Sequence, residues 1–371
     1  MEGERRDFLD TLLSTPSPSG FEAAGQRAWV EYVSAFADEV STDAYGNAVA
    51  VHEGTDDGPA IAFAGHADEI GYIVRRIDDD GFLRIGPIGG ADRTVSKGQH
   101  VTVHAAEGTP VPGVIGQTAI HLRERSEEEY EDIEAQFVDV GASSREEAAE
   151  LVEVGDPVTV RSTVRALRGA RFAASGLDNR VGTWAAAEGL RRAVEADAEA
   201  TVYAVSTVQE EVGLQGAKMV GFELAPDARV GREEGLRERR FCDAVVAVDV
   251  THATDHPNVD AKRRDPVRLG GGPVVTRGSV NHPVLVELAR DAAADAGVDV
   301  QLQAAGVRTG TDADAFYTSR GGVPSLTLGL PLRYMHTPVE VVDETDLDGV
   351  SALLGAIVDR AGDVDSFSVR V

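Results

Sequence analysis

Five side chains of the kinds that bind metal ions are spread over most of the chain, each where a strand is expected to end. They are His66, Asp178, Glu211, Asp249 and His336. Two histidines and three carboxylates can hold two divalent cations if one carboxylate bridges them. Glu210 stands beside a candidate ligand and is free to act as a base. This set suits the metal-assisted hydrolysis of an amide bond.

Each candidate ligand taken singly also has a structural explanation. A lone histidine such as His66 is usually structural, although Asp68, two residues later, could orient its imidazole. Asp178 stands at the start of an expected helix, and the N-cap explanation is the stronger one for this residue alone. Asp249 could equally cap a turn, and His336 could be a packed loop histidine. The combination, rather than any one residue, indicates a metal site.

The adjacent pair Glu210 and Glu211 is harder to explain structurally. Both carboxylates follow an apolar strand, and burying a charge there costs several kcal/mol unless it is paired or bound to a metal. Adjacent side chains diverge, so one can bind a metal while its neighbour reaches a water molecule. Function is therefore favoured over structure for this pair.

The composition restricts the partners. The 371 residues are enough for two domains, and 42% of them are hydrophobic. The net charge is −28 and only three residues are lysines, so nucleic acid is not expected as a partner. The acidity suits either an ordinary solvated surface or adaptation to a salt-rich cytoplasm, because salt screens self-repulsion. The scarcity of lysine favours a halophilic protein.

Two further features predict a cytoplasmic location. Cys242 is the only cysteine, which excludes an intrachain disulfide and fits a reducing interior. The first residues, 1–6, are not followed by the apolar region of a signal peptide, and no stretch reaches the length of a membrane span. We therefore expect no membrane partner.

Alternating strand and helix patterns predict an α/β fold with a largely parallel sheet and helices on both faces. The apolar run 60–64 is typical of a strand buried on both sides. Candidate ligands at the carboxyl ends of such strands fit the general rule for open α/β sheets. The expected strands are 48–52, 60–64, 201–206, 244–250 and 325–328, and the expected helices 6–14, 22–37, 179–194, 216–221, 283–296 and 347–361.

Between these elements lies a segment with a different sequence pattern. Short runs of Val, Ile and Thr separated by Gly, Asp and Pro predict an inserted β-rich, barrel-like domain at 71–164. One helix, 143–150, interrupts it, opened by a serine cap. The catalytic domain would then be discontinuous, at 1–70 and 165–371. The expected strands of the insert are 72–77, 82–85, 100–104, 113–115, 137–140 and 158–161.

The assembled motifs resemble those of the tetrahedral, or deblocking, aminopeptidases, a family of two-metal zinc exopeptidases that includes glutamyl aminopeptidases. The resemblance covers almost the whole chain and is highly specific for the family, although not for a substrate. It rests on seven segments in order: 15–20, 65–71, 177–180, 209–213, 248–251, 310–313 and 333–340.

The resemblance implies a role for each candidate. Asp178 would bridge two ions, with His66 and Asp249 completing one site, and Glu211 and His336 the other. The metals would be zinc or cobalt, although ligand chemistry alone does not exclude manganese.

It also implies how the reaction would proceed. Glu210 would take a proton from the water between the metals and return it to the leaving amine. Asp68 would support the ligands from behind. The enzyme would release N-terminal residues from peptide substrates. The β-rich insert would build a homodimer, and in this family dimers often assemble into a hollow dodecamer.

Two segments depart from the family pattern. The segment 229–241 looks longer than usual, which could alter assembly. Within it, residues 229–240 form a charged run that we expect to be an exposed loop. Residues 118–120 replace prolines often found there, which could alter the edge of the pocket.

Other functions stay open on the sequence alone. A related two-metal hydrolase, such as an acyl-amino-acid deacylase or a homologue labelled endoglucanase, would use the same frame. A non-catalytic scaffold is disfavoured because all six residues are present. The preferred N-terminal residue does not follow from the sequence: Arg333 could attract an acidic side chain, but it belongs to a motif shared across specificities.

Overall fold

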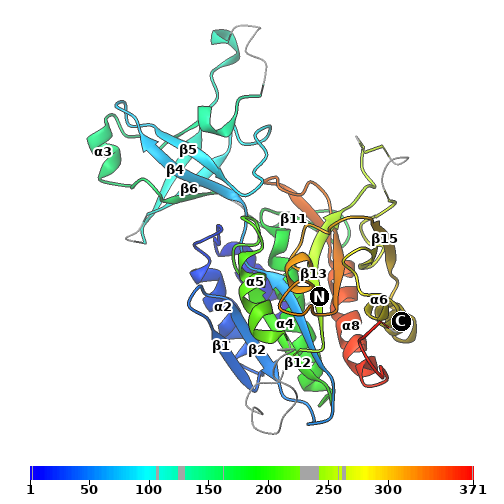
Figure 1. Ribbon diagram of the computed structural model, residues 1–371. Helices are drawn as coiled ribbons and strands as arrows, with labels where there is room; N and C mark the ends of the chain where they lie inside the picture. Colours follow the sequence, from blue (N-terminus) through cyan, green and yellow to red (C-terminus); the bar gives the residue numbers. More distant parts are fainter. Residues whose placement is uncertain are drawn as a thin grey trace.

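The structure is a computed structural model in which a small barrel projects from one end of a larger α/β body (Figure 1). The segment 229–241 singled out above lies outside the described residues. Those residues are 1, 3–105, 108–123, 130–161, 163–225, 242–257, 259–260, 265–369 and 371.

An eight-stranded mixed sheet forms the centre of the body, in the order β1-β2-β12-β3-β13-β16-β14-β15. Its four central strands are parallel to one another. All four are buried along most or all of their length, which explains their continuous apolar sequences. They are β12 (Thr201–Thr207), β3 (Ala60–His66), β13 (Ala244–His252) and β16 (Ser325–Leu332).

The outer strands make the sheet mixed. The hairpin β1 (Glu39–Thr42) and β2 (Ala48–His52) lies antiparallel beside β12. At the other edge, β14 (Val274–Gly278) runs antiparallel to β16 and parallel to β15 (Gln301–Ala305). The sequence did not reveal β1, β14 or β15, because these short outer strands have no continuous apolar run.

Helices cover both faces of the sheet, as predicted, and the two faces differ in character. Ile61 and Phe63 of β3 pack in the larger core, whereas Ala60, Ala62 and Ala64 face the smaller one. The larger core contains side chains of α1 (Glu4–Ser14), α2 (Ala23–Val33), α4 (Leu177–Glu195), α6 (Pro283–Ala296) and α8 (Glu344–Ala361). The smaller core contains side chains of α5 (Gln215–Leu224) and α7 (Ala313–Phe316).

The insert is a closed six-stranded barrel with its own apolar core. All six predicted strands are present. Helix α3 (Arg145–Ala149) interrupts them, and Ser144 caps it by accepting a hydrogen bond from the backbone N–H of Glu147. The strands are β4 (Gly71–Ile77), β5 (Leu83–Ile88), β6 (His100–His104), β7 (Pro110–Ile115), β8 (Phe137–Asp139) and β9 (Pro157–Val160).

A small three-stranded sheet joins the barrel to the body and was not foreseen. It consists of β10 (Arg165–Ala166), β11 (Arg171–Ala174) and β17 (Glu340–Asp343). The 3-10 turns Ile120–Leu122 and Ile133–Ala135 were not foreseen either.

The predicted α/β fold with a barrel-like insert is confirmed.

None of the helices in the described part of the chain combines the length and apolar character that a membrane crossing requires.

Helix α4 approaches β3 unusually closely at a pair of glycines. A Cβ atom added to Gly65 would lie 2.3 Å from the backbone carbon of Gly182 and 2.5 Å from the nitrogen of Thr183. Backbone atoms cannot yield as the end of a flexible side chain can. The absence of a side chain at Gly65 therefore sets the distance between α4 and the strand that carries His66.

We expect Gly65→Ala to lower the free energy of unfolding by about 1–3 kcal/mol, because α4 must move away from the sheet. Gly306→Ala is the matched control, since a Cβ there meets no atom within 4 Å. Denaturant unfolding of both variants measures the difference. Equal stability of the two would show that the sheet accommodates the extra methyl group.

Candidate metal centre

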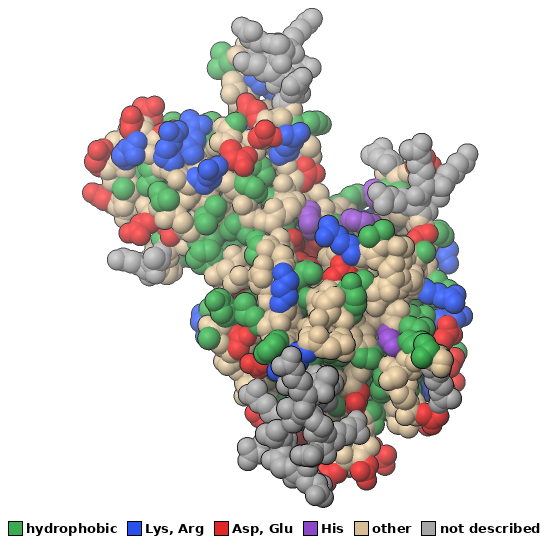
Figure 2. Space-filling view, viewed as in Figure 1, with side chains coloured by type: hydrophobic (Ala, Val, Ile, Leu, Met, Phe, Trp, Pro, Cys, Tyr) green, Lys and Arg blue, Asp and Glu red, His purple; other side chains and the backbone are tan. Residues whose placement is uncertain are grey.

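The candidate ligands meet at the end of the body that faces the barrel. His66 is the last residue of β3, and Asp249 lies in the second half of β13. Glu211 follows β12 by four residues, and Asp178 follows β11 by four. His336 lies in the loop between β16 and β17. Figure 2 shows histidine side chains beside the notch between the barrel and the body.

These residues form two groups that share Asp178. One group is His66, Asp178 and Asp249, and the other is Asp178, Glu211 and His336. Within each group, one candidate ligand atom from every residue lies within 4.8 Å of the others. The two carboxylate oxygens of Asp178 point to different histidines: Oδ1 lies 3.3 Å from Nε2 of His66, and Oδ2 lies 3.3 Å from Nε2 of His336.

The spacings within each group suit a small cation. Two ligands of one tetrahedral zinc ion, each bound at its usual length, are about 3.4 Å apart. Nε2 of His66 lies 3.7 Å from Oδ1 of Asp249, and Nε2 of His336 lies 3.5 Å from Oε1 of Glu211. These distances are near the separation expected of neighbouring ligands.

The ring orientation of both histidines also suits metal binding. Nδ1 of His66 lies 3.2 Å from the carbonyl oxygen of Asp68, and Nδ1 of His336 lies 3.2 Å from that of Gly90. A carbonyl can only accept a hydrogen bond, so Nδ1 carries the hydrogen in each ring. In the neutral imidazole, Nε2 then presents a lone pair toward the carboxylates, as metal-binding histidines commonly do.

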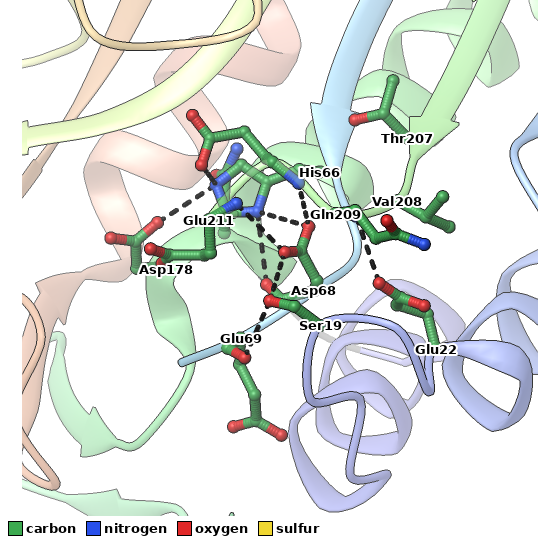
Figure 3. Close-up of polar contacts among 12 residues, drawn as sticks. Ser19, Glu22, His66, Asp68, Glu69, Asp178, Thr207, Val208, Gln209 and Glu211 are labelled. Atoms are coloured by element: carbon green, nitrogen blue, oxygen red, sulfur yellow. Dashed lines mark hydrogen bonds and ion pairs between the residues drawn. The ribbon is translucent and has the colours of Figure 1, made fainter. Parts of the chain in front are cut away.

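Asp68 is not one of the candidate ligands but binds the residues that carry them (Figure 3). Its side chain is fully buried. Oδ1 accepts a hydrogen bond from the backbone N–H of Glu210 (2.9 Å), and Oδ2 accepts one from that of Glu211 (3.1 Å) and one from the hydroxyl of Ser19 (2.6 Å). Oδ1 also lies 3.4 Å from Nδ1 of His66. One carboxylate thus holds the ends of β3 and β12 together.

Glu210 lies beside the group that contains His66 and belongs to neither group. Its Oε2 is 3.8 Å from Nε2 of His66, and its side chain is buried. Burial, reinforced by the nearby carboxylates of Asp249 and Asp312, raises the pKa of Glu210 far above its ordinary value. Glu210 is thus a buried carboxylate next to the candidate ligands that is not itself one of them.

The electrostatics of the cluster call for positive charge. Burial raises the pKa of Glu211 as well, and the Asp178 carboxylate adds to the effect. The hydrogen bond to Asp178 raises the pKa of His336 to about 9. In the described part of the chain, the carboxylates of the cluster form ion pairs only with His66 and His336. These carboxylates are those of Asp178, Glu210, Glu211 and Asp249. Divalent cations at the two groups would supply the missing charge, so the residues present fit a metal centre.

The structure does not support the N-cap explanation of Asp178. The regular part of α4 begins after Asn179, whose Oδ1 accepts a hydrogen bond from the backbone N–H of Gly182 (3.0 Å), so Asn179 rather than Asp178 caps the helix. Asp178 itself has non-helical backbone angles, and its side chain points to the two histidines. The N-cap explanation, which was favoured for this residue alone, is therefore wrong.

Several residues that shape the site escaped the sequence analysis. A Cβ added to Gly90 would lie 2.7 Å from Nδ1 of His336, and one added to Gly89 would lie 3.1 Å from Cβ of Glu211. This glycine pair follows β5 and lets the barrel approach both ligands. The sequence signal that could have identified them was a pair of adjacent glycines directly after a predicted strand. The contact of Ser19 with Asp68 had no sequence signal beyond its place in the segment 15–20.

Arg333 is not available as a receptor for acidic side chains. Its Nε lies 2.8 Å from Oδ1 of Asp255, and its Nη2 lies 2.7 Å from Oδ2 of the same carboxylate. This bidentate pair neutralises the guanidinium. The arginine therefore anchors the loop that carries His336, and the structure gives no support to an acidic preference based on it.

We expect Asp68→Asn to lower metal affinity about 10–100-fold, as loss of a partner behind metal ligands typically does. Asparagine has one acceptor oxygen, so its amide group would point at the N–H of Glu210 or Glu211. Elemental analysis after dialysis at limiting free zinc measures the loss. Ser19→Ala, which keeps both backbone contacts, should lose less. A full metal complement in Asp68→Asn would contradict this role.

Known proteins share both the sequence pattern and the fold. The profile of the M42 glutamyl aminopeptidase family matches residues 46–353. Lysyl aminopeptidase of Pyrococcus furiosus is 34% identical over 363 residues, which is 97% of this chain and 98% of the relative.

Solved structures agree with these matches. The TET aminopeptidase of a marine-sediment Thaumarchaeota archaeon has a TM-score of 0.86 and 29% identity, with 96% of each chain covered. The Pyrococcus horikoshii TET1 peptidase, described as assembling into a tetrahedron or a large octahedral shell, has a TM-score of 0.80 and 28% identity, covering 96% of this chain and 99% of its own. The aminopeptidase family inferred from the sequence is confirmed. The chain belongs to the M42 glutamyl aminopeptidase family, whose members are metal-dependent peptidases.

Proposed function

We propose that this protein is a two-metal aminopeptidase that releases N-terminal residues from short peptides. The observation that carries the proposal is the position of Asp178, whose two oxygens each lie 3.3 Å from Nε2 of a different histidine. Two cations bridged by one carboxylate require this arrangement, in which each oxygen faces a different group of ligands.

The two sites would be filled by zinc or cobalt. Each site offers one imidazole nitrogen and two carboxylates, Asp178 included, a donor set that zinc and cobalt accept. His66, Asp178 and Asp249 would hold one ion, and Asp178, Glu211 and His336 the other. When bound, the ions supply Lewis-acid chemistry that polarises the scissile carbonyl and makes a water molecule more acidic.

The residues of the chain would supply the proton transfers. Glu210 would accept a proton from the attacking water at a carboxylate oxygen and then donate it to the leaving amine. It must be ionised to do so, and its burial opposes ionisation, so compensating positive charge beside it is required. Asp68 would keep the backbone of Glu210 fixed while the proton moves. The side chain of Glu210 would thus be free to transfer the proton while Asp68 holds its backbone N–H.

We further infer that residues 71–164 form the dimerisation domain, that 1–70 and 165–371 form the catalytic domain, and that dimers build a larger homo-oligomer. The assembly of the Pyrococcus horikoshii relative supports this. Ile120, Leu122 and Tyr130 of the barrel are 70%, 77% and 66% exposed, which favours a partner surface. A cytoplasmic location and a requirement for salt, based on the net charge of −28, complete the proposal.

The first test is the need for a free N-terminus. We expect a short peptide to lose residues one at a time from its amino end, and its N-acetylated form to stay intact. Mass spectrometry of both digests shows the order of release. Carboxymethyl-cellulose and acetyl-amino acids, supplied in parallel, should remain unchanged. Internal fragments, or equal cleavage of the two peptides, would exclude an ordinary aminopeptidase.

The second test separates the base from its neighbouring ligand. We expect Glu210→Gln to lower kcat about 10²–10⁴-fold with the metal content unchanged, because only a general base is removed. Glu211→Gln weakens a ligand and should lower the metal content as well. Turnover and elemental analysis are measured on both variants. An active Glu210→Gln beside an inactive Glu211→Gln with full metal content would reverse the two roles.

A further inference from the structure

Glu340 is a buried carboxylate that binds the backbone of two different candidate ligands. Oε1 accepts a hydrogen bond from the N–H of His336 (2.9 Å), and Oε2 accepts one from the N–H of Asp178 (3.2 Å). Its side chain is 2% exposed. We propose that Glu340 is a positioning residue that holds His336 against Asp178, an inference that rests on the proposed two-metal site.

The small sheet explains how Glu340 reaches Asp178. Strand β17 begins at Glu340 and pairs antiparallel with β11, with Glu340 opposite Ala174. Asp178 follows Ala174 by four residues, through the left-handed turn at Gly176. The pairing of β11 with β17 therefore sets Glu340 beside the turn that delivers Asp178 to the site.

The loop that carries His336 needs such support. Arg333 and Val341 exchange two backbone hydrogen bonds of 3.0 and 3.1 Å, which close the loop at its base. Within it, Tyr334 and His336 have φ angles of 61° and 63°. This left-handed region is unfavourable for residues with side chains, so the loop needs contacts that fix it. The hydrogen bond from His336 to Glu340 is one such contact at the ligand itself.

Glu340 complements Asp68, because the two carboxylates hold different candidate residues of the site. Asp68 binds the backbone of Glu210 and Glu211 at the end of β12, whereas Glu340 binds that of Asp178 and His336. Each carboxylate uses both oxygens as acceptors. Glutamine at position 340 could accept from only one of the two N–H groups, and its amide would point a donor at the other. Both residues that Glu340 holds belong to the Glu211–His336 group, whereas only Asp178 belongs to the other group. The loss should therefore fall mainly on the ion that Glu211 and His336 would hold.

The test is a zinc titration of the metal-free protein in competition with a chromophoric chelator. His336→Ala removes a ligand and identifies the step that belongs to the Glu211–His336 group, while His66→Ala identifies the other. We expect Glu340→Gln to weaken the His336 step about 10–100-fold and to weaken the His66 step less. Glu344→Gln is the matched control, because Glu344 forms an ion pair with Arg6 away from the site, and it should titrate like the wild type.

The outcomes separate this inference from the proposed function. Wild-type protein that binds fewer than two zinc ions overturns the two-metal proposal, and with it the basis of this inference. The role of Glu340 alone is overturned in two cases, both with a wild type that binds two zinc ions. In the first, Glu340→Gln titrates like the wild type; in the second, its zinc binding is weakened only at the His66 step. If Glu340→Gln does not fold, Glu340→Asp tests the same step. Aspartate keeps the charge but is one methylene too short to reach both N–H groups.

Discussion

The accumulation of buried carboxylates around Asp178 is the constraint on which the rest of the site depends. Four carboxylates lie at one end of the sheet, and within the described chain their ion pairs are with two histidines. Burial alone makes the charged forms costly. Such a cluster is stable in its ionised form only beside compensating cations. The same positive charge would keep Glu210 ionised and able to accept a proton.

The scaffold brings this cluster together from elements that are distant in sequence. Parallel strands deliver their carboxyl ends to one edge, where β3 and β12 present His66 and the Glu210–Glu211 pair. Gly65 lets α4 lie close enough for Asp178 to face His66. The barrel contributes Gly90, whose carbonyl oxygen orients the ring of His336. Asp68 and Glu340 then fix the backbone on either side. The barrel is thus part of the candidate metal site as well as a candidate surface for assembly.

Much of this could be predicted from local sequence. The strands that carry His66 and Asp249 are continuous apolar runs, so their ends could be located without knowledge of the fold. The Glu210–Glu211 pair stood out because burial of adjacent charges has few structural explanations. The six barrel strands were also recognisable, because short β-branched runs separated by turn residues are a local pattern.

The remainder depends on contacts between distant residues. The role of Asp178 could not be assigned from its neighbours, because an N-cap and a bridging ligand have the same local sequence. The contact of His336 with Gly90 joins residues 246 positions apart. Closure of the barrel depends on pairing Tyr72 with Val158, and no local pattern specifies that partner. Glu340 was part of a recognised motif, but its two hydrogen bonds appear only when β11 and β17 are paired.

The most direct test of the account is an anomalous-scattering experiment on crystals of the zinc-loaded protein. We expect two peaks, each about 2.0–2.2 Å from a different oxygen of Asp178. One should contact His66 and Asp249, and the other Glu211 and His336. Asp178→Ala crystals grown at the same zinc concentration should lose at least one peak. A single ion, or two ions that do not share Asp178, would contradict the central claim that this carboxylate bridges a two-metal centre.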